Sequence, residues 1–167
     1  QRFDAAADPV GGEFVINSTT AGRQAEVAMT GLSDGGFVAL WENHGVGIFG
    51  QRYDAAGNAV GSEFQASEGP RHTPQVAELS NGGFVGIWAE VGTLHARIFN
   101  SDGSPASGEL NINSGTLSID TPYLNSQGSA VVGLPDGGFY VTYRVYQSEA
   151  SQGYDVLGQR FTADGTA

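Results

Sequence analysis

The chain has 167 residues, of which 26 are glycine, 40% are hydrophobic and 15% are charged, so its composition is that of one folded domain and excludes a disordered chain. Its net charge of −11, with arginine as the only strongly basic residue, disfavours nucleic acid and membrane insertion and is compatible with cations or neutral ligands such as sugars. Without cysteine it has no disulfide framework, thiolate zinc site or cysteine nucleophile, and no apolar run is long enough to span a membrane.

A short motif recurs from the first residue onward. Gln1-Arg2-Phe3 is followed by the similar triplets Gln51-Arg52-Tyr53, Ala96-Arg97-Ile98 and Gln159-Arg160-Phe161. An acidic-apolar phrase follows each of the first three, at Gly12-Glu13-Phe14, Ser62-Glu63-Phe64 and Gly108-Glu109-Leu110. We therefore expect a single repeat domain over 1–167, with repeats at about 1–50, 51–98 and 99–161. Because the chain opens inside the motif, we expect it to be part of a longer protein.

Each repeat also contains an acid or amide followed by two glycines, between two short apolar runs. The three copies are Asp34-Gly35-Gly36, Asn81-Gly82-Gly83 and Asp136-Gly137-Gly138. Such residues accept positive φ angles, so each copy predicts a β-hairpin with a tight primed turn.

The apolar runs predict four strands in each repeat and no helix. In chain order, the strands are expected at about 14–17, 26–30, 37–42, 46–53, 63–66, 75–79, 84–90, 94–99, 110–112, 129–134, 139–146 and 154–161. The third repeat carries two insertions, 114–127 and 147–153. Since loops that lengthen in one repeat are where individual function gathers, these insertions are candidate functional loops.

The strand after each double glycine is apolar on both faces. In the first repeat, Phe37, Ala39 and Trp41 alternate with Val38 and Leu40, so both faces need to be covered. Three four-stranded antiparallel repeats of this kind predict an all-β fold with β-propeller-like blades. The alternative is a β-trefoil, which also has three four-stranded repeats. Since propeller rings typically contain four to eight blades, we expect either a homo-oligomer or the remainder of a larger propeller as partner.

The repeats resemble those of a known class of proteins. The stretch 51–57, then 61–64, then 79–85 with Trp88, resembles repeats in very large secreted RTX-type bacterial adhesin-like proteins. The resemblance implies an extracellular or cell-surface location and a structural or adhesive role. The glycine-rich nonapeptide arrays that bind calcium in RTX regions are not in this sequence, so the resemblance implies no calcium site.

The recurring arginines and glutamates are candidate structural pairs. Since they recur at a nearly constant spacing, each arginine is expected to pair across adjacent strands with the glutamate that follows it, as Arg2–Glu13, Arg52–Glu63 and Arg97–Glu109. The alternative is a ring of arginines that converges on an anion. Recurrence in every unit favours the structural role.

Two further sets of residues are candidates for binding. Trp41, Trp88 and Tyr143 occupy one equivalent position, where they are either core residues or a platform for a glycan. Asn100 and Asp102 resemble the opening of a Ca²⁺ loop, although a glycine-containing turn between two strands is the favoured interpretation. The histidines His44, His72 and His95 do not have the spacing of a metal site.

No catalytic residue is predicted, because no strand-to-helix serine elbow, phosphate loop or repeated carboxylate pair is found. The sequence thus predicts a non-enzymatic structural or adhesive module of a secreted bacterial surface protein, which assembles by strand or blade completion. The alternative is a carbohydrate-binding, lectin-like module.

Overall fold

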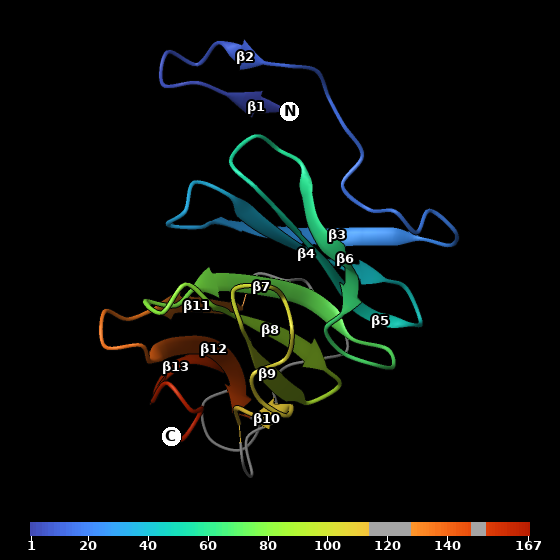
Figure 1. Cartoon of the computed structure of the whole chain (residues 1–167). Coiled ribbons are helices and arrows are strands. Elements are labelled where there is room, and N and C mark those ends of the chain that lie inside the picture. The colour runs from blue at the N-terminus through green and yellow to red at the C-terminus, as the bar shows by residue number, and fades with distance from the viewer. Residues whose placement is uncertain (114–127, 148–152) are drawn as a thin grey trace.

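The computed structural model describes residues 1–113, 128–147 and 153–167, and all of their regular structure is β (Figure 1). None of these residues lies in a helix that could cross a membrane. The strands are β1 (Arg2–Phe3), β2 (Pro9–Val10), β3 (Gln24–Gly31), β4 (Phe37–Asn43), β5 (Gly47–Tyr53), β6 (Ala59–Gln65), β7 (His72–Glu78), β8 (Phe84–Glu90), β9 (Thr93–Phe99), β10 (Leu110–Asn111), β11 (Ser129–Gly133), β12 (Phe139–Gln147) and β13 (Gly153–Phe161). The insertion predicted at 114–127 and most of that at 147–153 lie outside the described residues.

The strands form three antiparallel meanders and a small hairpin. The first sheet has the order β3-β4-β5-β6, the second β7-β8-β9-β10 and the third β11-β12-β13, while β1 and β2 pair with each other. Every pairing is antiparallel. The all-β antiparallel fold predicted from the sequence is confirmed.

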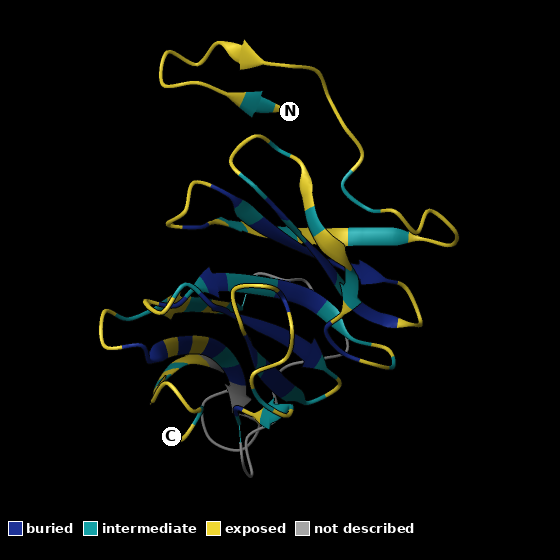
Figure 2. Ribbon diagram, viewed as in Figure 1, coloured by how far each residue is buried: buried dark blue, intermediate teal, exposed yellow. Residues whose placement is uncertain are grey.

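The second sheet lies between the other two and shares a hydrophobic core with each (Figure 2). One core joins Val38, Leu40 and Ile48 of the first sheet to Phe84 and Trp88 of the second. The other joins the second sheet, through residues such as Ile87 and Leu94, to Phe139 and Val141 of the third. All of β8 except its last residue is buried. The prediction that the strand after the turn is covered on both faces is therefore confirmed for β8.

The double-glycine turns are not the primed turns that the sequence predicts. In the first sheet, the Gly35 amide donates to the Leu32 carbonyl at 2.9 Å, and only Gly35 within the turn has a positive φ, of 86°. This is a type I turn that ends in a left-handed glycine, a common three-residue hairpin loop. Gly82 and Gly137 repeat it, with φ of 81° and 90°.

The second glycine of each pair is needed for a different reason. A Cβ on Gly36 would lie 2.3 Å from the carbonyl oxygen of Tyr53, so no side chain fits. The same carbonyl approach recurs at 2.4 Å for Gly83 and for Gly138. One glycine thus supplies a backbone angle and the next supplies space for the neighbouring strand.

The structural units are offset from the predicted repeats. No strand forms at the predicted 14–17, and the phrase that contains Glu63 and Phe64 lies in β6, the last strand of the first sheet. Phe64 then packs on the second sheet, 6.1 Å from Phe84 and 5.4 Å from Phe99 between ring centroids. The second phrase thus ends the first sheet and covers the second, and Leu110 of the third phrase likewise lies in β10 and packs against the core shared with the third sheet.

Candidate functional site

The recurring arginines have partners other than those predicted. Arg52 forms an ion pair with Asp34 of the double-glycine turn, and Arg160 forms the equivalent pair with Asp136. Glu63 instead accepts hydrogen bonds from the Ser18 amide at 2.8 Å, the Ser18 hydroxyl at 2.9 Å and the Thr19 amide at 3.2 Å. The predicted Arg52–Glu63 pair is therefore wrong, because each group is satisfied elsewhere.

In the second repeat the predicted alignment is wrong by one residue. Ile98 pairs with Val85 as Arg52 pairs with Val38, so Ile98 and not Arg97 occupies the Arg52 position. A slip of one residue moves a side chain to the other face of a sheet. The acid that would pair with an arginine here is also missing, because Asn81 stands where the first repeat has Asp34.

The remaining members of the predicted pairs are also separated. Arg2 donates to the carbonyl of Ala56 at 2.6 Å, and Arg97 donates to the carbonyl of Ala66 at 2.7 Å. Glu109 lies 3.3 Å from Arg71, and Glu13 is exposed. The predicted pairs Arg2–Glu13 and Arg97–Glu109 are therefore wrong. Both arginines instead donate hydrogen bonds to backbone carbonyls of other segments.

The three equivalent aromatic residues are buried. The exposed fractions are 4% for Trp41, 0% for Trp88 and 7% for Tyr143. Trp88 and Tyr143 are part of the two cores, whereas Trp41 belongs to neither core and lines a pocket. None of the three offers an open platform for a glycan. Both indole Nε1 atoms nevertheless lack a hydrogen-bond partner.

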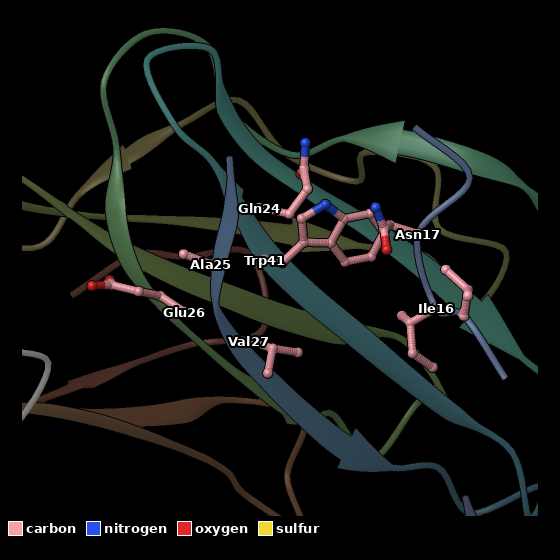
Figure 3. Close-up of a pocket in the computed structure, with 8 residues that line it drawn as sticks. Ile16, Asn17, Gln24, Ala25, Glu26, Val27 and Trp41 are labelled. Atoms are coloured by element: carbon pink, nitrogen blue, oxygen red, sulfur yellow. The ribbon is translucent and has the colours of Figure 1, made fainter. Parts of the chain in front are cut away.

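A pocket of about 340 Å³ lies beside Trp41, between the segment that precedes β3 and the start of β3 (Figure 3). Its walls are mainly apolar, and it is lined by Val15, Ile16, Asn17, Gln24, Ala25, Glu26, Val27 and Trp41. In Figure 3 the amides of Gln24 and Asn17 and the indole nitrogen of Trp41 lie toward one end, while Ile16 and Val27 lie toward the other. The pocket thus has a polar end and an apolar end.

The polar end contains two buried groups of opposite hydrogen-bonding sense. Trp41 Nε1 is a donor and Gln24 Oε1 is an acceptor, and neither has a partner. The Gln24 amide nitrogen donates to the Ala21 carbonyl at 3.0 Å, which fixes the direction of the amide. Such unpaired buried groups cost free energy unless a ligand or water satisfies them.

Backbone strain lies next to this pocket. Glu26 has a φ of 51° at a β-bulge in β3, and its carboxylate accepts the amide of Thr73 at 2.8 Å. Thr73 has a φ of 53° at the corresponding bulge in β7. A positive φ is strained at a residue that has a Cβ. The hydrogen bond between Thr73 and Glu26 therefore joins two strained residues of β3 and β7.

A second pocket, of about 390 Å³, occupies the corresponding place in the next unit. Its lining residues Gln65, Ser67 and Arg71 stand where the first pocket has Val15, Asn17 and Gln24, and Glu68, Arg97 and Glu109 complete it. Its character is polar, since Arg71 contacts Glu90 at 2.6 Å as well as Glu109. The two pockets share a position in the fold and differ in chemistry.

Histidines and carboxylates meet at two further places. Glu42 is buried and lies 2.8 Å from His44 and 3.1 Å from His72. His95 is buried, with its ring nitrogens 3.2 Å from Glu90 and 3.0 Å from Glu109. Within the described part of the chain, no group of three or more His, Asp or Glu side chains is arranged to hold a metal ion.

The candidate calcium residues Asn100 and Asp102 belong to the turn that follows β9. The side-chain amide of Asn100 donates to the Ser104 hydroxyl at 3.0 Å. The Ser104 hydroxyl and the Ser104 backbone N–H donate to the Asp102 carboxylate at 2.6 and 2.8 Å. These hydrogen bonds from Ser104 lower the pKa of the Asp102 carboxyl. The turn explains both residues, and calcium binding here stays a prediction.

Sequence reasoning missed the pocket residues Asn17 and Gln24. Both lie in polar stretches with no repeated counterpart of the same type, since their equivalents are Ser67 and Arg71. The sequence signal for these residues is the difference in residue type between equivalent positions of the two units. That difference can be recognised only when the units are aligned by their strands.

No protein-family model matches this chain, and no curated protein is similar to it in sequence. Among solved structures, the chain is similar to the crystal structure of a protein of unknown function from Dyadobacter fermentans DSM 18053, with a TM-score of 0.57 and 14% identity. The similarity covers 87% of this chain and 40% of that one. The chain therefore shares its all-β fold with part of a longer protein.

Proposed function

We propose that the chain is a non-enzymatic structural repeat module, whose sheets act as propeller-like blades and whose two outer faces bind further sheets of the same kind. The meander order within each sheet supports blades over a β-trefoil. The first strands of the three sheets also gather, since β7 lies beside both β3 and β11. Blades in a ring bring their inner strands together in this way.

The observation that carries this proposal is a difference between equivalent positions. Residues on the outer faces are exposed, whereas their equivalents between two sheets are buried. On the third sheet, Val156 is 76% exposed, while Ile48 and Leu94, its equivalents in the other two sheets, are fully buried against the next sheet. Tyr140 is exposed as well, whereas the equivalent Val38 and Val85 are buried. The third sheet thus presents a face that its two counterparts use for packing.

On the first sheet, the part of the outer face along β3 is exposed, whereas Ala39 and Trp41 on the same face are buried. Met29 is 63% exposed, although the equivalent Val76 and Val131 pack against the two cores. Val27 is also exposed on this strand. Large apolar side chains that are exposed side by side on one strand are candidates for an interface.

The secreted and adhesive parts of the proposal rest on the resemblance to RTX-type adhesin-like repeats. The strongly acidic surface, at −11, also suits a module that meets cations and neutral glycans more readily than nucleic acid. A matching chain that extends well beyond the region of similarity supports a module set within a longer protein.

The test is the solution mass of the chain at increasing concentration, by analytical ultracentrifugation. We expect concentration-dependent association, because the outer face of the third sheet packs on the outer face of the first sheet of another copy. Val156→Asp should abolish association, since a charge would be buried in the new interface. A chain that stays monomeric at millimolar concentration would contradict the stacking role.

Val91→Asp provides the matched control. Val91 is 75% exposed, like Val156, but it lies in the turn between β8 and β9 and not on an outer face. The control should associate as the wild type does. Equal effects of the two changes would point to a general charge effect and count against the proposed faces.

A further inference from the structure

We propose that the pocket beside Trp41 binds one neutral sugar residue, a role that is independent of stacking. The volume of about 340 Å³ falls within the range of about 300–1,000 Å³ that is usual for small-molecule sites. The pocket lies between two segments of the same chain, so a single chain forms it completely.

The two unpaired groups define the chemistry of the ligand. Trp41 Nε1 needs an acceptor and Gln24 Oε1 needs a donor. A hydroxyl group can both donate and accept a hydrogen bond, so a sugar ring with several hydroxyls offers both kinds of partner. Trp41 is 96% buried, from its exposed fraction of 4%, so its N–H is held in place before any ligand arrives.

The remaining walls fit the rest of a sugar. Val15, Ile16 and Val27 offer an apolar surface for the C–H face of a pyranose ring. The charged lining residue is Glu26, and its carboxylate is already engaged by the Thr73 amide. With a net charge of −11 over the chain, the site favours a neutral ligand over an anionic one.

The corresponding pocket in the next unit shows that stacking leaves this site open. The pocket lined by Gln65, Ser67 and Arg71 persists although the first sheet packs on that face of the second sheet. A further sheet on the first sheet should therefore leave the pocket beside Trp41 accessible. Its polar counterpart contains ion pairs instead of unpaired neutral groups, so sugar binding is expected in the first unit alone.

The experiment uses the two indole N–H signals of the ¹⁵N-labelled chain, which contains only Trp41 and Trp88. The probes are glucose, galactose, mannose and N-acetylglucosamine at up to about 50 mM, where a site with millimolar affinity is close to saturation. At least one sugar should shift the Trp41 signal in a saturable way and leave the Trp88 signal in place. If none of them shifts it, or if both signals shift together, the proposal is overturned.

Two arginine substitutions separate the site from the surrounding surface. Val27→Arg should fill the pocket mouth and weaken binding by tenfold or more, while Met29→Arg, on the same exposed strand but outside the pocket, should leave binding unchanged. Both residues are exposed, so both variants should fold. Trp41→Phe, which keeps an aromatic ring and removes the donor, should weaken binding by roughly tenfold, as followed by calorimetry. Equal affinity in Val27→Arg and Met29→Arg would sink the proposal whatever the outcome for stacking.

Discussion

At the scale of single residues, glycines with a positive φ set the backbone of the turns. Gly57, in the turn between β5 and β6, has a φ of 88°, and Gly103 and Gly165 repeat this conformation with φ of 87° and 85°. In the N-terminal hairpin the equivalent residue is Ala7, with a φ of 66°. A residue with a Cβ is thus tolerated there, at an energetic cost.

We expect Gly57→Ala to destabilise the chain by about 1 kcal/mol, because alanine disfavours the left-handed conformation. Gly108→Ala is the control, since Gly108 does not have a positive φ and a Cβ there would meet nothing within 4 Å. Urea denaturation of the two variants provides the comparison. Equal stabilities would show that the backbone angle is not what requires glycine at this turn.

The sequence predicts which residues form the turns better than it predicts which residues contact each other across neighbouring strands. The double glycines are visible as a pattern, but Gly36 is required by the approach of the Tyr53 carbonyl, which only the folded sheet reveals. The alignment of Arg97 with Arg52 followed residue type, whereas the strand register places Ile98 there. Register depends on pairing between strands, and residue identity alone does not encode it.

At the scale of elements, the ion pair between Asp34 and Arg52 ties the double-glycine turn to β5. The second sheet lacks both charges together, with Asn81 and Ile98 at the equivalent positions. The hydrogen bond within the turn is the same in both sheets. The side-chain oxygen of Asp34 accepts from the backbone N–H of Gly36 at 2.9 Å, and that of Asn81 accepts from the backbone N–H of Gly83 at 3.0 Å. The pair is therefore exchangeable as a unit.

We expect Asp34→Asn to destabilise the chain by about 1 kcal/mol, because the Arg52 side chain is only 12% exposed and loses its carboxylate partner. Adding Arg52→Ile should recover most of this loss, as the second sheet suggests. Asp136→Asn is the control and should cost less than about 0.5 kcal/mol, since Arg160 is 45% exposed. Thermal denaturation measures all of these variants, and an equal loss in both single variants would contradict the account.

Glu63 ties β6 to the segment that precedes β3, and this link should respond to pH. Burial raises the pKa of Glu63, but hydrogen bonds from Thr19 and Ser18 outweigh burial and hold the pKa below its ordinary value of 4.5. A carboxyl with a lowered pKa in the folded state stabilises that state above its unfolded pKa. Its contribution is lost as pH falls through the folded value.

We therefore expect the difference in unfolding free energy between wild type and Glu63→Gln to be constant near neutral pH and to shrink below about pH 4.5. Chemical denaturation at a series of pH values measures this difference. Comparing the two proteins at each pH removes most of the effect of the other carboxyls. A difference that stays constant down to pH 3 would show that Glu63 does not depend on its charge.

At the scale of the whole molecule, the second sheet packs against both outer sheets, so we expect the stack to unfold as a single cooperative unit. Its β8 strand contributes to both cores, so neither outer sheet packs independently of it. The sequence could predict this, because a strand that is apolar on both faces must be covered twice. It could not predict the pocket beside Trp41, which depends on where an irregular segment crosses the first sheet.

Leu40→Ala and Ile87→Ala each remove a fully buried side chain, from the first and the second core respectively. We expect each to destabilise the chain by about 2–5 kcal/mol. Unfolding should remain a single transition in both variants, with tryptophan fluorescence and circular dichroism giving the same midpoint. Separate transitions in Leu40→Ala would show that the first sheet folds on its own.

The overlap between units also bears on how the chain folds as it is synthesised. Phe64 and Leu110 each belong to one sheet and lie close to a turn glycine of the next unit: a Cβ added at Gly103 would be 3.2 Å from Phe64, and one added at Gly165 would be 2.4 Å from Leu110. Each of these two sheets therefore offers an apolar side chain on which the turn of the next sheet packs. We expect the first sheet to be unstable on its own during synthesis, because its buried core is completed only when the second sheet packs on it.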